Sequence, residues 1–395
     1  MKMNGKYRLT ICLEGLYYTV VLAFIIGGGV LRGINLLFVL AGMMIGPLIY
    51  NWRMVMVSLG RLRVKRILPE GVCAGDLLVV EFAATGIAKR GDSSAIVVTD
   101  RIRRADDSQE QEAMLAEVFF PLVEAGKTDI QSYQGRLMER GRYEFGPFHV
   151  STRFPLGLVR RTLTVADTEE LIVFPRPGRL SPRWKQISQA TLVGVGGSQS
   201  RQGLVEGDFY GLRDWRSGDS RRWIHWRTSA RRNALAVRQF ERPRSQDIVL
   251  LLDLWEPAGA SDAERDNVEL AISFAATVAE EICRNGGSEI GIGIAGREIS
   301  WKRGAGSRPL LTEIMEQLAQ AKSTRRDHLP ELLAQSMHEI PHGTMTVVVG
   351  TRPCDLQDTQ RFSAVWDDPA LRNALREIRG IDVSAAELFE YFEVA

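Results

Sequence analysis

The 395-residue sequence has few of the features that mark common enzymes and secreted proteins. Its four cysteines, Cys12, Cys73, Cys283 and Cys354, are scattered without C-x-x-C spacing. They therefore indicate neither a disulfide framework nor a zinc site, and they suit a reducing compartment. The sequence contains no glycine-rich phosphate loop and no nucleophile elbow. Its formal net charge of +2 is too small for a protein whose main role is to coat a polyanion.

Lysine is missing altogether from the segment between Leu212 and Arg244. This segment holds ten arginines, interleaved with Trp215, Trp223 and Trp226. A face that is merely solvated mixes the two cations, whereas guanidinium groups stack on aromatic rings and bind carboxylates through paired hydrogen bonds. We therefore expect an ordered, densely hydrogen-bonded element here.

Charge is also absent from two adjacent runs near the start of the chain, residues 15–31 and 33–50. Each is close to the shortest helix that crosses a hydrocarbon core about 30 Å thick, so the two runs predict a transmembrane helical hairpin within residues 1–55. Only Arg32 lies between them, and the positive-inside rule then places both ends in the cytoplasm. The flanking basic residues are Lys2, Lys6, Arg8, Arg53, Arg61, Arg63, Lys65 and Arg66. The alternative is a cleaved signal peptide followed by a core helix, but no small-residue cleavage site supports it.

Residues 60–175 show short strand-like runs separated by glycine, proline and aspartate. This pattern predicts an antiparallel β-sandwich of immunoglobulin-like type. The runs are residues 77–82, 95–98, 116–120, 143–145 and 171–174. Residues 176–206, rich in proline, glycine and serine, are expected to form an irregular linker.

Residues 207–395 complete the chain, and from Asp247 onward apolar strand-like runs alternate with stretches of helical spacing. This alternation predicts an α/β domain with a mostly parallel sheet. The expected strands are residues 247–253, 289–295, 298–301, 345–349 and 381–383. The expected helices are residues 267–283, 310–321, 328–337 and 371–378.

The order of these elements, with a small edge strand after the second main strand, resembles the von Willebrand factor A fold. That fold commonly holds a metal ion where its first strand ends in Asp-x-Ser-x-Ser. Here Asp253 is followed by Leu254-Trp255-Glu256-Pro257, so both serines are missing. The loop at residues 350–353 also lacks the expected aspartate. Since Asp253 and Glu256 alone cannot supply the oxygen ligands that a hard cation needs, we predict no metal site.

The arginine-rich segment follows a recognisable pattern: Gly207-Asp208, Leu212-Arg213-Asp214-Trp215, Gly218-Asp219, Arg222, Ile224, Trp226 and Ser229-Ala230-Arg231. It resembles the signature of the bacterial family called domain of unknown function 58. Two upstream motifs resemble the family too, Arg140-Gly141-x-Tyr143-x-x-Gly146-Pro147 and Phe154-Pro155-Leu156-Gly157-Leu158. The second departs from the customary Asp-Pro-Phe-Gly-Leu.

The resemblance covers nearly the whole chain and implies a location and a partner. The family's usual layout is a membrane hairpin, a β-rich domain, the signature and a von Willebrand factor A-like domain. The location implied is the bacterial inner membrane, with both termini and the soluble domains in the cytoplasm. Members are often encoded beside MoxR-type AAA+ ATPases, which implies that the partner is such an ATPase or its client.

The signature itself allows two interpretations. In the first, its arginines and tryptophans lock a domain junction by pairing with aspartates, and Asp219 or Ser220 caps a helix that begins near Arg221. Residues 235–239 would then alternate as a strand that feeds the α/β sheet. In the second, the segment is a recognition surface for a partner or an anionic ligand. The residues concerned are Asp208, Arg213, Trp215, Gly218, Asp219, Arg222, Trp226, Ser229 and Arg231.

The leading functional hypothesis is a non-enzymatic, membrane-anchored adaptor with no catalytic residue, cofactor or metal. The first alternative is a module that binds nucleic acid or a phosphate ligand through the arginines and tryptophans, although nucleic acid is the less expected partner. The second is a hydrolase built on Asp219, His225 and Ser229, since His225 and Ser229 are one helical turn apart.

Overall fold

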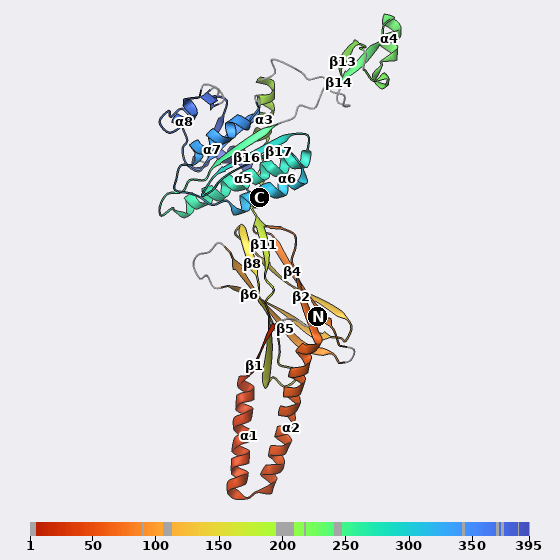
Figure 1. The fold of residues 1–395 in the computed structure, drawn as a ribbon, viewed down its shortest axis with the longest axis vertical. Helices are drawn as coiled ribbons and strands as arrows, with labels where there is room; N and C mark the ends of the chain where they lie inside the picture. The colour runs from red at the N-terminus through yellow and green to blue at the C-terminus, as the bar shows by residue number, and fades with distance from the viewer. Residues whose placement is uncertain are drawn as a thin grey trace. The chain divides into compact units, whose positions relative to one another are not determined.

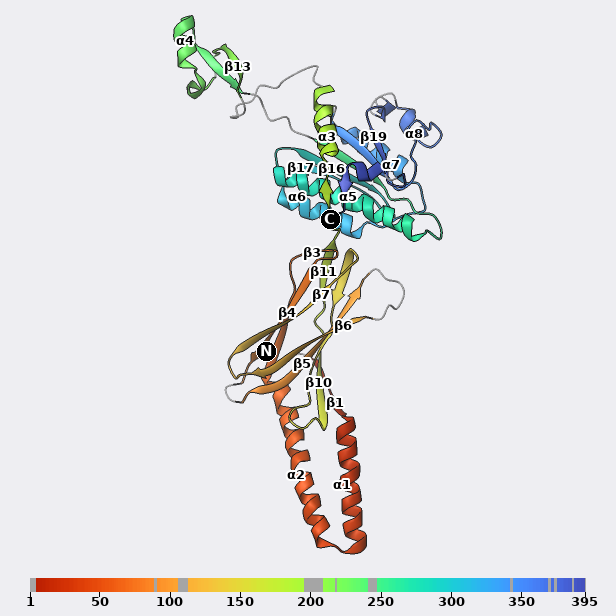
Figure 2. The same cartoon turned by 180° about the vertical axis from the view of Figure 1, so that it is seen from behind.

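The computed structural model describes residues 5–88, 91–105, 113–194, 209–216, 219–240, 247–341, 344–368, 371–372, 375–385 and 387–394. The chain divides into two compact units. One is built on Met1–Arg176, and the other on most of the chain from Pro177 onward. Figures 1 and 2 show the elements of each unit from opposite sides.

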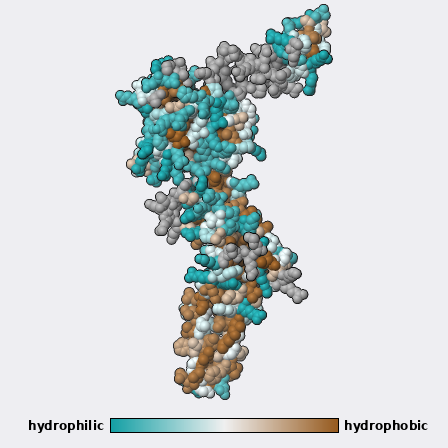
Figure 3. Space-filling model, in the orientation of Figure 1, coloured by the Kyte–Doolittle hydropathy of each residue, from teal (hydrophilic) through white to brown (hydrophobic). Residues whose placement is uncertain are grey.

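The first unit begins with two long apolar helices, α1 (Leu13–Arg32) and α2 (Asn35–Ser58). By length and composition both are able to cross a membrane, and the hairpin that they form is predominantly apolar on the face seen in Figure 3. Helix α2 runs beyond the predicted end at residue 50. Its last turns are held by protein contacts, since Val55 is fully buried and Leu59, just past the helix, joins the core of the following domain.

That domain is a sandwich of two sheets. The larger has eight strands in the order β1-β10-β9-β5-β8-β11-β3, with β6 paired to β5, and the smaller has three in the order β2-β4-β7. Their bounds are β1 (Gly5–Ile11), β2 (Leu62–Ile67), β3 (Val72–Cys73), β4 (Leu77–Gly86), β5 (Ser93–Arg104), β6 (Met114–Val123), β7 (Thr128–Arg136), β8 (Gly141–Phe145), β9 (Phe148–Thr152), β10 (Val159–Val165) and β11 (Glu169–Phe174). Alternate residues of these strands point inward and bury Phe82, Phe120 and Phe148 in one core. The predicted immunoglobulin-like sandwich is confirmed.

Strand β1 precedes α1 and yet belongs to the sandwich. It pairs antiparallel with β10, from Gly5 opposite Val165 to Ile11 opposite Val159. This strand was not predicted from the sequence. Because β2 follows α2 almost directly, both ends of the helical hairpin are attached to the same folded domain.

The prediction of an irregular linker over residues 176–206 is wrong for the part that the structure describes. Residues there form β12 (Arg179–Leu180) and α3 (Pro182–Gly194). Trp184 on α3 is 3% exposed and packs edge-on against Phe274, with ring centroids 5.0 Å apart. Burial of this large aromatic outweighs the turn-forming composition of the segment.

The second unit contains the α/β domain. Its five-stranded sheet has the order β17-β16-β15-β18-β19, and only β17 runs antiparallel to its neighbour. The bounds are β15 (Ile248–Asp253), β16 (Glu289–Ala295), β17 (Ile299–Ala305), β18 (Met345–Gly350) and β19 (Arg379–Asp382), with the short β20 (Phe392–Glu393) paired to β12. The helices are α5 (Asp262–Asn285), α6 (Arg308–Gln320), α7 (Leu329–Ser336) and α8 (Ser363–Trp366). Every residue of β15 and β18 is buried, as expected of central strands covered on both faces. The mostly parallel sheet and the small edge strand after its second main strand are confirmed, and that edge strand runs antiparallel.

The signature residues form a separate small module. Strand β13 (Phe209–Asp214) pairs antiparallel with β14 (Ala236–Phe240), and helix α4 (Trp226–Arg232) lies between them in sequence. The prediction that residues 235–239 join the α/β sheet is therefore wrong. Strand β13 offers a partner only about twenty residues away, so the pairing is satisfied locally.

Candidate functional site: an arginine–aspartate cluster and an arginine–tryptophan module

Two arginines and two aspartates gather at the carboxyl edge of the α/β sheet. We call Asp253, Asp327, Arg352 and Arg361 the Arg–Asp cluster. Asp253 is the last residue of β15, and it lies opposite Gly350, the last residue of β18. Because parallel strands end at the same edge of a sheet, the loop after β18 brings Arg352 and Arg361 to Asp253.

Asp253 is the buried centre of this cluster, with a side chain that is 0% exposed. Arg352 Nε and Arg361 Nη2 each donate a hydrogen bond to its Oδ2 atom, both at 3.1 Å. Its other oxygen, Oδ1, is buried and has no hydrogen-bond partner among the described residues. Two guanidinium groups thus converge on one oxygen of a buried carboxylate.

Asp327 closes the cluster on its outer side. Arg361 contacts it through two nitrogens, Nε at 2.6 Å from Oδ2 and Nη2 at 3.0 Å from Oδ1. Arg352 Nη2 lies 2.7 Å from Oδ1. The two guanidinium groups therefore bridge an inner and an outer carboxylate, and the four charges sum to zero.

Neighbouring side chains hold the arginines in place. The Arg352 guanidinium lies over the Trp255 ring, 4.8 Å from its centroid, and Trp255 Nε1 donates to the Arg325 carbonyl. Thr351 donates its hydroxyl to the Trp255 carbonyl at 2.6 Å, which ties the loops after β15 and β18 together. Arg361 also contacts the Cys354 sulfur.

The electrostatics of the two aspartates differ because their burial differs. Burial raises the pKa of Asp253, against the opposing attraction of Arg352 and Arg361. Burial also acts on Asp327, but hydrogen bonds and attraction from Arg361 outweigh it and lower the pKa of that carboxyl. Burial raises the pKa of the Cys354 thiol, so this cysteine is not an activated nucleophile.

The residues of the Arg–Asp cluster do not fit the divalent cation that the fold resemblance implies. A hard cation needs about six oxygen ligands, and only the inward oxygen of Asp253 is left uncommitted. Glu256 is engaged elsewhere, since it accepts a hydrogen bond from the Ser323 hydroxyl. Across the described ranges, no three His, Cys, Asp or Glu side chains gather in a way that could hold a metal ion. The guanidinium groups supply the positive charge that Asp253 requires.

The partners of Asp253 in this cluster were missed from the sequence. In the sequence, the loop at residues 350–353 shows only that the expected aspartate is missing, and no motif there indicates a role for its arginine. One signal was available: Arg352 occupies the loop where the fold resemblance leads one to expect an acidic residue, and Asp253 at the end of a neighbouring strand needs a counter-charge. Arg361 lies 108 residues from Asp253, and nothing in the sequence pattern joins the two.

The second candidate site is the signature module. His225 precedes α4 and caps it, since its Nδ1 atom accepts a hydrogen bond from the Thr228 amide. Ser229 is buried and binds main-chain groups, donating to the His225 carbonyl at 3.1 Å and accepting from the Ala236 amide at 2.9 Å. The His225 side chain therefore caps α4, and the Ser229 side chain fastens α4 to β14.

The predicted capping of a helix from Arg221 by Asp219 or Ser220 is wrong. Residues Arg221–Trp223 form only a 3₁₀ turn, and no side-chain cap hydrogen bond precedes it. The chain is extended at Ile224, which pairs with Val237 as an isolated bridge, so the α-helix starts later, at Trp226.

Asp219 instead pairs with Arg213 through two hydrogen bonds. Arg213 Nη1 lies 2.6 Å from Oδ2 and Nη2 lies 2.7 Å from Oδ1. The Arg216 amide adds a third donor at 2.8 Å. The hydrogen bonds from Arg213 lower the pKa of Asp219, which keeps the carboxylate ionised.

The remaining signature residues lie mostly on the surface of the module. Trp226 is 67% exposed and Trp215 is 37% exposed, while Arg222 and Arg231 are both exposed. The interpretation in which these two arginines are buried partners of aspartates is wrong, because a helix of seven residues on a two-stranded sheet leaves too little core to enclose them. Asp208 and Gly218 lie outside the described residues.

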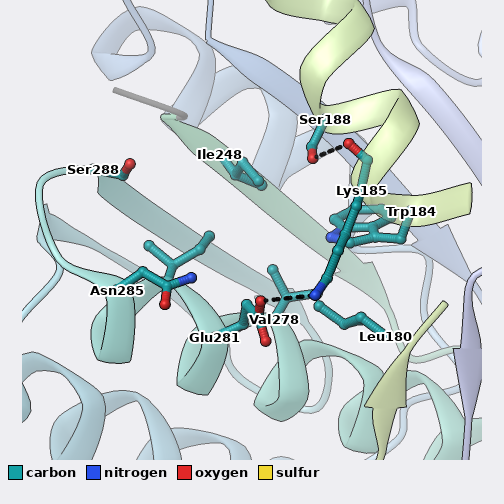
Figure 4. Close-up of a pocket in the computed structure, with 10 residues that line it drawn as sticks. Leu180, Trp184, Lys185, Ser188, Ile248, Val278, Glu281, Asn285 and Ser288 are labelled. Atoms are coloured by element: carbon teal, nitrogen blue, oxygen red, sulfur yellow. Dashed lines mark hydrogen bonds and ion pairs between the residues drawn. The ribbon is translucent and has the colours of Figure 1, made fainter. Parts of the chain in front are cut away.

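One small cavity of about 250 Å³ lies between α3 and α5 (Figure 4). Its wall is apolar at Trp184 and Ile248, and Lys185 pairs with Glu281 across its mouth at 3.5 Å. This volume is below the roughly 300–1,000 Å³ of typical ligand sites. We therefore treat it as a packing gap.

Comparison with known proteins identifies a region that holds most of both candidate sites, while Arg361 of the Arg–Asp cluster lies beyond its end. Residues 211–354 match the family model described as "Protein of unknown function DUF58". This region belongs to the DUF58 family. A curated relative, "Uncharacterized protein YeaD" of Bacillus subtilis (strain 168), is 28% identical over 204 residues. The match covers 51% of this chain and 48% of YeaD, so the chain spans about half the length of that relative.

Solved structures show only distant likeness to this DUF58 protein. The CARDB domain of PF1109 from Pyrococcus furiosus is 10% identical and covers 29% of this chain and 95% of its own, with a TM-score of 0.18. A beta-glucosidase from Listeria innocua is 16% identical and covers 28% and 16%, with a TM-score of 0.19. Neither likeness bears on function.

The Arg213–Asp219 pair yields a first prediction. Arg213→Lys keeps the charge but removes the two-pronged contact, so it is expected to destabilise the signature module by about 1 kcal/mol. Arg222→Lys and Arg231→Lys, both at exposed positions, are the matched controls and should change stability by no more than about 0.5 kcal/mol. Amide hydrogen exchange of residues 211–238 measures the difference. Equal protection in all three variants would contradict the assignment.

Proposed function

We propose that this DUF58 protein is a non-enzymatic adaptor, anchored in the bacterial inner membrane by α1 and α2, that presents its cytoplasmic domains to a protein partner. The observation that carries the proposal is the exposed basic and aromatic surface of the signature module. Its members on and beside α4 are Arg221, Arg222, Trp226, Arg227, Arg231 and Arg232, all exposed. Tryptophan and arginine are the residue types that dominate binding energy at protein interfaces.

The charge of this surface indicates the kind of partner. Five exposed arginines lie within twelve residues, and α4 itself contains no acidic residue. Such a surface complements an acidic patch on another protein, where guanidinium groups form paired hydrogen bonds with carboxylates. The family association makes a MoxR-type AAA+ ATPase, or its client, the partner that we propose.

Two features of the candidate sites support a non-enzymatic role. His225 and Ser229, the pair behind the hydrolase hypothesis, both serve the main chain of the module. The Arg–Asp cluster has its charges balanced within the protein, which suits a rigid support for surrounding loops. Under the adaptor hypothesis, the His225–Ser229 pair and the Arg–Asp cluster have structural roles only.

Membrane topology supplies the second prediction. Strands β1 and β2 attach both ends of the hairpin to one sandwich, and basic residues flank the hairpin on that side. A reporter fused after residue 60 is therefore expected to be active in the cytoplasm. A reporter signal from the periplasm at that position would contradict the proposal that the adaptor's folded domains lie in the cytoplasm. A fusion within the turn at Arg32–Gly33 is the control and should report the periplasm.

A third prediction tests the partner. Purified MoxR-type ATPase from the same bacterium is expected to bind the full-length protein in nanodiscs, and Arg222→Ala with Trp226→Ala should weaken binding by about tenfold or more. The control is Arg265→Ala with Arg284→Ala, two exposed positions on α5. Loss of binding in the control alone, or in neither variant, contradicts the proposal.

The same measurement separates the adaptor from the nucleic-acid alternative. Exposed Trp226 beside arginines would also suit base stacking on a single strand. Each phosphate contact releases counterions, so the affinity of an oligonucleotide bound there would fall steeply as the salt concentration rises. For each phosphate contact, the affinity would fall about fivefold for every tenfold rise in salt concentration. Tight, salt-steep oligonucleotide binding without ATPase binding would favour that alternative.

A further inference from the structure

The loop between β9 and β10 exposes two large apolar side chains. Phe154 is 40% exposed and Leu156 is 49% exposed. The loop is closed by a hydrogen bond from the Gly157 amide to the Arg153 carbonyl at 2.8 Å. These residues belong to the Phe-Pro-Leu-Gly-Leu motif, for which neither candidate site offers a role.

Main-chain contacts place this loop against the start of α1. The Cys12 amide donates to the Leu158 carbonyl at 3.0 Å. Gly15 passes so close that a Cβ atom there would lie 2.0 Å from the Leu158 oxygen. Only glycine permits this approach, so the loop and the first turn of α1 are built to lie together.

The start of β10, directly after the loop, touches α2. The Val159 amide donates to Asn51 Oδ1 at 3.2 Å, and Asn51 is fully buried. Further on, Arg161 donates to the Met56 carbonyl. The loop therefore lies beside the start of α1, at Cys12 and Gly15, and its C-terminal end lies at the level of Asn51 on α2.

Interfacial residue types surround that level. Tyr17 on α1 is 68% exposed, and Tyr50 and Trp52 on α2 are 55% and 45% exposed. Tyrosine and tryptophan concentrate where a bilayer meets water. Arg153 and Arg160, which flank the loop, are exposed as well and supply positive charge beside it.

We infer that Phe154 and Leu156 insert into the headgroup–acyl boundary of the membrane beside the helical hairpin, with Arg153 and Arg160 facing anionic headgroups. This inference rests on the proposed membrane anchoring. It assigns the motif a lipid-binding role: two apolar side chains and a basic pair dock the sandwich on the bilayer surface. A flexible attachment through the helices alone would not need them.

Photo-crosslinking of the full-length protein tests the inference. Benzoylphenylalanine is placed at residue 154 in vesicles of phosphatidylethanolamine and phosphatidylglycerol that carry alkyne-tagged lipid. The benchmarks are residue 24, where Phe24 on α1 is 77% exposed, and residue 138, where Met138 is 73% exposed at the opposite end of the sandwich. We expect lipid adducts at 154 to approach the yield at 24 and to exceed the yield at 138 by about tenfold or more.

The benchmarks also separate this inference from the anchoring on which it rests. Lipid adducts at 24 together with a yield at 154 no higher than at 138 would overturn the inference and leave the anchor standing. Adducts between residue 154 and a second protein chain, in place of lipid, would overturn it as well. Absence of lipid adducts at 24 and 154 would overturn both the anchoring and the inference.

Discussion

Replacement of both Arg352 and Arg361 by alanine is expected to lower the free energy of unfolding of the α/β domain by about 3 to 5 kcal/mol. Asp253 is completely buried, and these two arginines supply its hydrogen bonds from cationic side chains. Removal of both leaves a desolvated carboxylate without a counter-charge. Urea unfolding of the full-length protein, followed by the fluorescence of tryptophans in this domain, measures the change.

The expected loss depends on pH. Burial raises the pKa of Asp253, and the loss of both arginines would raise it further. A carboxyl with a raised folded-state pKa favours folding below its ordinary value of 3.8 and loses that contribution as pH rises through the folded-state pKa. The variant therefore recovers stability as pH falls. The pKa of Asp327 is lowered in the folded wild type, so Asp327 stabilises the wild type near neutral pH and loses this effect as the pH falls. The difference in unfolding free energy between the wild type and the variant therefore narrows in acid.

Two controls sharpen this test. Arg265→Ala with Arg284→Ala removes two exposed arginines of α5 and should cost no more than about 1 kcal/mol at any pH. Millimolar magnesium or manganese should leave the melting temperature of the wild type unchanged, because a cation that bound only the folded form would raise it. A clear rise would show that the Arg–Asp cluster does admit a metal ion.

The sequence predicted the elements whose signals are local. Uncharged runs located both helices of the hairpin, and continuous apolar runs located β15 and β18, since these patterns depend on burial by any partner. It failed where burial is specific. Burial of Trp184 stabilises helix α3 within a segment whose proline, glycine and serine content predicts an irregular linker. Strand β1 is short and is stabilised by pairing with β10, which follows it by about 150 residues.

Charge was the least predictable property of the candidate sites. Arg213 and Asp219 are six residues apart and do pair, whereas Arg222 and Arg231 are exposed. The arginine pattern alone could not distinguish these outcomes, because arginine suits both buried pairs and exposed surfaces. Arg66 illustrates the same limit. The sequence counts it among the basic residues that flank the membrane, and the structure buries it inside the sandwich.

All three guanidinium nitrogens of Arg66 donate hydrogen bonds inside the sandwich. Its Nε and Nη2 atoms donate to Asp100 at 3.1 and 2.8 Å, and Nη1 donates to the Phe145 carbonyl at 2.8 Å. The guanidinium lies 5.1 Å from the centroid of the Phe148 ring, and Tyr133 donates its hydroxyl to Asp100 at 3.0 Å. Both charged side chains are 0% exposed.

Arg66→Ala is accordingly expected to destabilise the sandwich by about 3 to 5 kcal/mol, since it leaves Asp100 buried, charged and without a cation. Lys65→Ala, at the exposed neighbouring position on β2, is the matched control and should change stability by no more than about 0.5 kcal/mol. The double change Arg66→Met with Asp100→Leu removes both charges and fills their volume, so it should restore most of the loss. Urea unfolding of the full-length protein, monitored by hydrogen exchange of the amides in β2 and β5, measures the stability of all three variants. If the double variant were as unstable as Arg66→Ala, the stranded charge would not be the cause.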